Sequence, residues 1–188
     1  MKAFASTLTL FVCSVNAFSI NGHLAVANIA QNLLTDNDAA SLKAALSQLV
    51  TLRNLDPVLT VHEGKHPFIE CATFADDIKY HGGMWQQGFH FIDYPFVDQP
   101  GKTAADYPGS DVIPANNIVA AINDITDWLS GKNGKGYQQS YMYDYIQHRL
   151  YPGNYNAARS YALRLLIHYV GDLHQPFHTT SRFNDKYP

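Results

Sequence analysis

The chain has 188 residues, a length typical of one domain, and a formal net charge of −3. Apolar residues make up 46% of the sequence and aromatic residues 13%, which is enough for a packed core. The acidic balance argues against a basic nucleic-acid platform. It does not exclude nucleic-acid chemistry, because a site with several metal ions carries positive charge of its own.

Residues 1–17 have the pattern of a secretory signal peptide. Lys2 supplies the positive charge, and Ala3 to Val12 form an apolar run that is too short to span a membrane. Cleavage after Ala17 would make Phe18 the first residue of the mature chain. We therefore expect a protein that is secreted or endolysosomal, without a membrane span.

The mature chain would keep a single cysteine, because Cys13 lies within the predicted signal peptide. A lone cysteine is unusual in a secreted protein. We expect Cys71 either to be a buried free thiol or to form a disulfide bond with a cysteine that is absent from this chain.

The mature sequence is dominated by helical periodicity, so we expect an all-α domain over residues 18–188 with long irregular loops. Helices are predicted at 23–34, 38–49, 68–80, 116–129, 137–150 and 155–173. Asp36 is placed to cap the second helix. Residues 81–115 hold four prolines and are predicted to form a long loop, a feature that is usually functional in a compact domain.

The last predicted helix carries the run His168-Tyr-Val-Gly-Asp-Leu-His-Gln-Pro-Phe-His178. His168 and Asp172 are four residues apart, so they share one face of the helix. Pro176 ends the helix and lets His178 turn back toward the same site. Two neutral imidazoles and a carboxylate that converge in this way are typical zinc ligands. The run therefore predicts a metalloenzyme.

Other segments supply further donors. Asp76 lies in an apolar helix, where a carboxylate is costly unless it is paired or bound to metal. His90 stands in the run Phe89-His-Phe-Ile-Asp93, and His23 follows five residues after the predicted new N-terminus. His174 lies between the predicted ligands, and we expect it to support the site rather than to bind metal.

Taken together, these segments resemble the zinc-dependent, single-strand-specific nucleases of the S1/P1 (class I) family, which are distantly similar to bacterial zinc phospholipase C. The resemblance runs from Phe18 to the end of the chain, and its most specific part is the run from Gly171 to His178. It implies a multi-helical, monomeric endonuclease that hydrolyses phosphodiester bonds of single-stranded DNA or RNA, with 3′-nucleotidase activity.

The resemblance also implies three zinc ions. The first would be held by Asp76, His90, His168 and Asp172. The second would be held by the amine and carbonyl of Phe18, by His23 and by a shared Asp172, and the third by His178 with later residues. Two metals that clamp water and phosphate are a known route to phosphoester hydrolysis. Asp76 and Asp172 are therefore the predicted catalytic residues.

Three further residues are assigned to the substrate by the same resemblance. Lys79, one turn beyond Asp76, would contact phosphate. Phe91 would stack on a base, and Asp93 would hydrogen-bond to its edge.

Two features depart from the family pattern. Phe18 stands where the family usually has Trp, and the later His and Asp of the third zinc site have no counterpart before Pro188. We expect the third site to be incomplete in these residues. The alternatives are a zinc phospholipase C, which shares the ligand set, and a truncated, inactive zinc-binding protein.

Overall fold

The computed structural model describes residues 20–110, 112–131 and 136–186. The predicted signal peptide, Cys13 and Phe18 lie outside these ranges. The helices and helical turns are α1 (Ile20–Asn37), α2 (Ala39–Leu55), α3 (Pro67–Glu70), η1 (Cys71–Thr73), α4 (Phe74–Asp77), η2 (Ile78–His81), η3 (Gly83–His90), η4 (Ala104–Asp106), α5 (Ile118–Ser130), η5 (Gly136–Gln139), α6 (Tyr141–Tyr143), η6 (Asp144–Leu150), α7 (Tyr155–Leu173) and α8 (Pro176–Thr179). The predicted all-α class is confirmed, because the only sheet in the described ranges is the strand pair β1 (Tyr94–Val97) and β2 (Thr180–Phe183).

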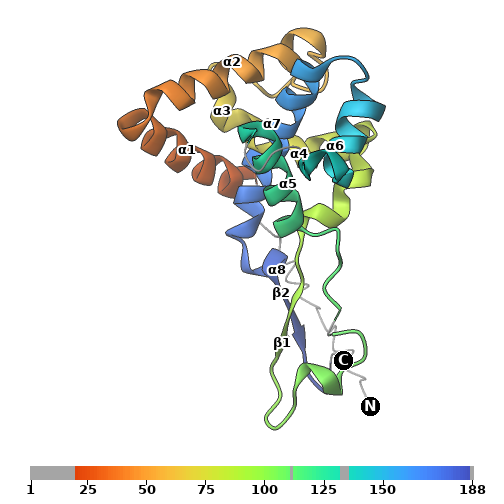
Figure 1. Ribbon diagram of the computed structural model, residues 1–188. Helices are drawn as coiled ribbons and strands as arrows, with labels where there is room; N and C mark the ends of the chain where they lie inside the picture. The colour runs from red at the N-terminus through yellow and green to blue at the C-terminus, as the bar shows by residue number, and fades with distance from the viewer. Residues whose placement is uncertain (1–19, 111, 132–135, 187–188) are drawn as a thin grey trace, which may run out of the picture.

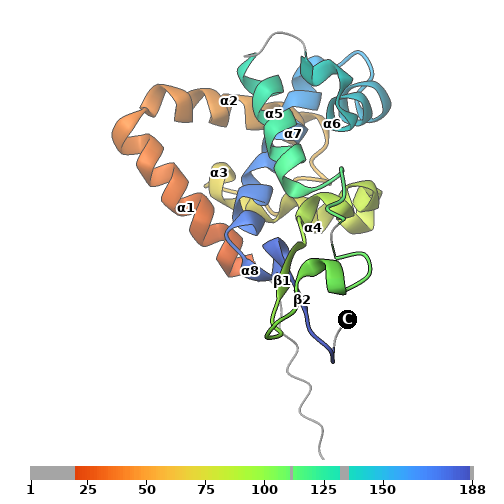
Figure 2. The ribbon, with the colours of Figure 1, turned by 60° about the horizontal axis from the view of Figure 1, so that its bottom comes forward.

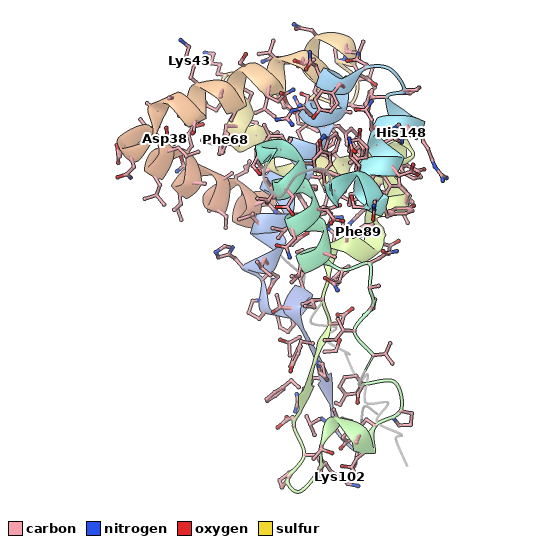
Figure 3. The ribbon with its side chains drawn as sticks, in the orientation of Figure 1. Asp38, Lys43, Phe68, Phe89, Lys102 and His148 are labelled. Atoms are coloured by element: carbon pink, nitrogen blue, oxygen red, sulfur yellow. The ribbon has the colours of Figure 1, made fainter. Side chains whose placement is uncertain are left out.

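Helices α1 and α2 form a V whose turn is marked by Asp38 (Figures 1 and 3). Both helices are longer than the sequence predicted. Asp38 caps α2, because its carboxylate accepts a hydrogen bond from the Ser41 backbone N–H at 3.1 Å. The predicted cap, Asp36, is wrong: it lies inside α1.

Helix α7 is the central element and has the predicted bounds, 155–173. Asn154 caps its first turn by accepting a hydrogen bond from the Ala157 N–H at 3.1 Å. Helices α1, α2 and α5 all pack against α7. The core around it is built from large apolar side chains, among them Leu52, Phe74, Phe89, Ile118, Ile125, Trp128, Met142, Ile146, Leu165 and Tyr169. Figure 3 places Phe89 within this body and His148 on its outer edge.

Two predicted helices are broken into shorter turns. Residues 68–80 form α3, η1, α4 and η2 in succession, and residues 137–150 form η5, α6 and a π-helical segment, η6. After η2 the chain turns at Gly82, which has φ +84°, and Gly83 then packs against Ile78: an added Cβ would lie 2.6 Å from the Ile78 carbonyl oxygen. This tight local turn separates η2 from η3.

The predicted loop 81–115 contains more structure than expected, namely η3, β1 and η4. Strand β1 pairs in parallel with β2, in the register Tyr94 to Thr180. Figures 1 and 2 show this ribbon extending from the helical body, and Figure 3 places Lys102 at its far end. The pairing begins just before the strands, where the Ile92 N–H donates to the His178 carbonyl at 2.9 Å. The ribbon thus fastens the segment after η3 to the segment after α7.

Cys71 is buried and forms no disulfide bond with any described residue. Its thiol donates to the Phe68 carbonyl at 3.4 Å, and burial raises its pKa well above the ordinary value. Within the described part of the chain, Cys71 is thus a buried thiol, as one of the two expectations has it. No helix within the described ranges is long and apolar enough to cross a membrane.

Candidate metal centre

Five predicted ligands come together at the core of the molecule, although they belong to four different helical elements. They form two groups of possible metal donors, and within each group the donor atoms lie within 4.8 Å of one another. One group is Asp76, His90 and His168, and the other is His23, His168 and Asp172. His168 belongs to both groups, whereas the sequence prediction assigned this residue to the first zinc alone.

The first group, taken together with Asp172, has a spacing close to that of the ligands of a single zinc ion. His168 Nε2 lies 3.2 Å from His90 Nδ1 and 3.1 Å from Asp172 Oδ2. Asp76 Oδ1 lies 3.8 Å from His168 Nε2 and 3.9 Å from His90 Nδ1. Ligand bonds of 2.0–2.1 Å in a tetrahedron separate neighbouring donors by about 3.3 Å. These four side chains therefore fit one ion with small adjustments.

The two carboxylate oxygens of Asp172 face different neighbours. Oδ2 lies 2.7 Å from His90 Nδ1, on the side of the first group. Oδ1 lies 3.4 Å from His23 Nε2 and also 3.4 Å from His178 Nδ1. A carboxylate has an acceptor lone pair to offer on each oxygen. This arrangement is compatible with the predicted sharing of Asp172 between two metals.

Two of the imidazoles are oriented by backbone carbonyls. The His168 Nδ1–H donates to the Ala72 carbonyl at 2.6 Å, and the His178 Nδ1–H donates to the His90 carbonyl at 2.8 Å. Each bond fixes the ring and leaves Nε2 as the nitrogen with the lone pair. Histidines that bind metal are usually held in this manner by their other nitrogen.

Some polar atoms at the centre lack the partner that burial normally demands. No hydrogen bond from the described residues satisfies Asp172 Oδ1 or His178 Nε2, and both atoms are buried. Buried polar atoms of this kind are rare in proteins, and an ion or water is a common reason for them. The donor set, of imidazole nitrogens and carboxylate oxygens, is one that binds zinc in proteins.

The charge states at the centre suit cation binding. Burial and, to a smaller extent, the nearby His168 lower the pKa of His23 to about 4, so its ring is neutral at pH 7. Burial also lowers the pKa of His90. For Asp172, burial would favour the protonated acid, but the contacts with His168 and His90 outweigh it and hold the pKa below the ordinary value. Neutral imidazoles facing an ionised carboxylate are the forms that bind metal.

The other predicted site residues lie around this centre. His178 is buried beside Asp172, but it belongs to neither donor group formed by the described residues. Lys79 Nζ lies 2.7 Å from Asp76 Oδ1. Phe91 stacks on the ring of His178, with centroids 4.4 Å apart, and Asp93 is exposed and accepts a hydrogen bond from Ser181 Oγ at 3.2 Å.

His174 is exposed, and its Nδ1–H donates to the Val170 carbonyl at 2.6 Å at the end of α7. It therefore does not pack against the donors, and the expectation that His174 supports the site is wrong. Two residues that matter to the centre were missed in the sequence: Gly171, which contacts His23, and Arg164, which is buried one turn before His168. A glycine and an arginine inside an otherwise apolar helical pattern were the available signals.

The model of the S1/P1 nuclease family matches residues 18–186. The chain belongs to the S1/P1 nuclease family. It is therefore a nuclease, a hydrolase that acts on phosphodiester bonds of nucleic acid. Comparisons with the curated proteins and with the solved structures give no significant match.

The family match and the geometry concern the same residues. The matched range includes all the donors that the structure brings together, from His23 on α1 to Asp172 on α7. The family is known as zinc-dependent, and the two donor groups could hold such ions.

Proposed function

We propose that this S1/P1 nuclease is a zinc-dependent endonuclease that cleaves single-stranded DNA or RNA and also has 3′-nucleotidase activity. The observation that carries the proposal is the pair of donor groups that share His168, with the oxygens of Asp172 divided between them. Hydrolysis of a phosphodiester requires stabilisation of both the attacking and the leaving oxygen, and adjacent metal sites serve this purpose.

When bound, zinc would polarise a phosphoryl oxygen and make a water molecule more acidic. Asp76, His90, His168 and Asp172 would hold the first ion, and His23 with Asp172 would contribute to the second. Asp172 is only 1% exposed, so its charge acts in a medium where electrostatic interactions are strong. Asp76 is partly exposed, so its carboxylate is accessible from solvent.

Three residues near the donors support a single-stranded substrate. Phe91 presents an aromatic ring beside the centre, and the base of an unpaired nucleotide can stack on such a ring. Asp93 holds a backbone φ of +53°, a region that Asp adopts more readily than most residues, and its carboxylate is exposed toward solvent. Lys79 has three N–H donors, so it can contact a phosphate and keep its contact with Asp76.

Phe91→Ala and Asp93→Ala are each expected to weaken nucleotide hydrolysis without loss of zinc. Stacking of a base on one aromatic contributes ~1–3 kcal/mol. This corresponds to roughly 5- to 150-fold in KM for Phe91→Ala, at 1.4 kcal/mol per decade. The measurement is the steady-state rate on a short single-stranded oligonucleotide, together with zinc content by elemental analysis.

Phe96→Ala provides a matched control, because Phe96 is 54% exposed on the neighbouring strand and takes no part in the centre. We expect wild-type kinetics for it. If Phe91→Ala and Phe96→Ala behave alike, the stacking role of Phe91 is contradicted.

The proposal as a whole is tested with the purified chain and four substrates. We expect zinc in the protein, cleavage of single-stranded DNA and RNA well above that of duplex DNA, and release of phosphate from a nucleoside 3′-monophosphate. A chelator should abolish these activities and zinc should restore them. Hydrolysis of phosphatidylcholine without cleavage of nucleic acid would instead favour a phospholipase C, and zinc without any hydrolysis would favour an inactive zinc-binding protein.

We also propose that the protein is exported and that Phe18, freed by cleavage after Ala17, completes the site of His23 through its backbone amine and carbonyl. The support is the sequence pattern of residues 1–17 and the position of His23 near the start of α1. Sequencing the N-terminus of the natural protein tests this, and a chain that begins at Met1 contradicts it.

A further inference from the structure

Gly171 lies in the last two turns of α7, directly before Asp172. Its backbone is helical and does not have the positive φ that favours glycine elsewhere in this chain. Glycine in a helix interior weakens the helix relative to alanine. The local conformation therefore gives no reason for glycine at this position.

The space above Gly171 does give a reason. A Cβ atom built on Gly171 would lie 2.5 Å from His23 Nδ1, 3.2 Å from its Cε1 and 3.4 Å from its Cγ. The imidazole of His23, from α1, thus lies directly on the backbone of α7. It is held there on a second side by the ring of His168, with centroids 4.0 Å apart and an interplanar angle of 13°.

The ring of His23 has little freedom to move aside. It is 2% exposed, and its Nε2 lies 3.4 Å from Asp172 Oδ1. Restoring ordinary contact with a Cβ would require a shift of about 0.9 Å, from 2.5 Å to 3.4 Å. Ligands of a metal site must stay within about 0.5 Å of their productive positions. A side chain at position 171 is thus incompatible with His23 as a ligand.

Gly83 shows the contrast. A Cβ there would meet the backbone oxygen of Ile78 at 2.6 Å, so this glycine serves chain packing. At Gly171 the first atom met belongs to a predicted metal ligand, and the glycine stands next to another one.

We propose that Gly171 is a positioning residue for the second metal site: its missing side chain admits the ring of His23 onto α7 and aligns it with Asp172. The inference rests on the proposed zinc-dependent function for its effect on metal binding. The contact between Gly171 and His23 stands without that function.

The first experiment compares zinc binding by the wild type, Gly171→Ala and Gly136→Ala. We expect Gly171→Ala to bind zinc at the His23 site 10- to 100-fold more weakly, the range typical of residues that orient ligands. Gly136→Ala is the matched control, because a Cβ at Gly136 meets no atom of the described residues within 4 Å, and it should bind zinc like the wild type. Wild-type zinc affinity and stoichiometry in Gly171→Ala would overturn the proposal.

The second experiment separates the ring contact from a general effect on α7. Thermal unfolding midpoints are measured in zinc-containing buffer for the wild type, Gly171→Ala, His23→Ala and the double variant. We expect Gly171→Ala to lower the midpoint when His23 is present. In the His23→Ala background it should leave the midpoint unchanged or raise it, because the helix then gains an alanine without a clash.

An equal decrease in both backgrounds would overturn the proposal, because Gly171 would then not act through His23. The four unfolding midpoints test the contact between Gly171 and His23 even if the wild-type chain binds no zinc. An absence of zinc binding by the wild type would refute the proposed zinc-dependent function, but it would not refute this contact.

Discussion

Asp172→Asn is expected to lose zinc from both proposed zinc sites and to abolish hydrolysis of single-stranded DNA. The change keeps the size of the side chain but removes the negative charge, and it replaces one of the two oxygens by an amide nitrogen that does not bind metal. Both oxygens of Asp172 face predicted ligands, at 2.7 Å for His90 and 3.4 Å for His23. The loss of zinc affinity should exceed the roughly 10- to 100-fold typical of residues that only orient ligands.

Zinc per chain after dialysis and the initial rate on single-stranded DNA are the measurements, with far-UV circular dichroism as the check on folding. His174→Ala is the control: it lies two residues further on, is exposed, and contacts the Val170 carbonyl rather than the donors. It should retain zinc and activity. Equal zinc loss in Asp172→Asn and His174→Ala would show that the assignment of Asp172 is wrong.

Arg164→Met is expected to lower the free energy of unfolding by ~3–5 kcal/mol, because it leaves a buried carboxylate without its partner. The side chains of Arg164 and Glu63 are 0% and 2% exposed, and two guanidinium nitrogens lie 2.5 and 2.6 Å from the two carboxylate oxygens. Arg164 also donates to the Ser160 and Leu49 carbonyls, each at 3.0 Å.

Such a loss is a large part of the ~5–15 kcal/mol that stabilises a typical domain. Denaturant unfolding followed by circular dichroism measures it. Arg149→Met is the control, since Arg149 is 65% exposed and pairs with Asp144 at 3.6 Å, so its loss should cost less than about 1 kcal/mol. Combining Arg164→Met with Glu63→Leu should restore much of the stability, because both charges are then gone. A double variant as unstable as Arg164→Met alone would contradict this explanation.

The buried pair of Arg164 and Glu63 also holds neighbouring elements against the helix that carries His168 and Asp172. Arg164 stands one turn before His168 on α7, and through Glu63 it ties the loop between α2 and α3 to this helix. The carbonyl of Leu49 brings α2 to the same guanidinium. None of these contacts could be predicted from the sequence, because the partners are about a hundred residues apart.

The local part of the centre was accessible from the sequence. The spacing of His168 and Asp172 predicted a shared helix face, and Pro176 predicted the break that returns His178 toward it. Both expectations follow from backbone geometry alone. The helix 155–173 was predicted from its helical periodicity with the correct bounds, and the structure adds that Asn154 caps its first turn.

Where the backbone is shaped by distant contacts, the sequence prediction was less successful. The segment 68–80 was expected to be one helix, but it is divided into short turns, and the carbonyl of Ala72 is used to orient His168. The strand β1 lay within a predicted loop, because its pairing partner β2 follows α8 much later in the chain. A four-residue strand has too little local pattern to be recognised without its partner.

The sequence by itself determined the all-α class, the family and the residue types of the centre, because periodicity and a specific run of ligands are written in neighbouring positions. Only the tertiary structure decided that His168 serves two donor groups, that the oxygens of Asp172 point in different directions, and that the ring of His23 rests on Gly171. These features depend on the packing of α1, α4 and η3 against α7. Such packing brings together residues that are far apart in the chain, so no local sequence pattern reveals it.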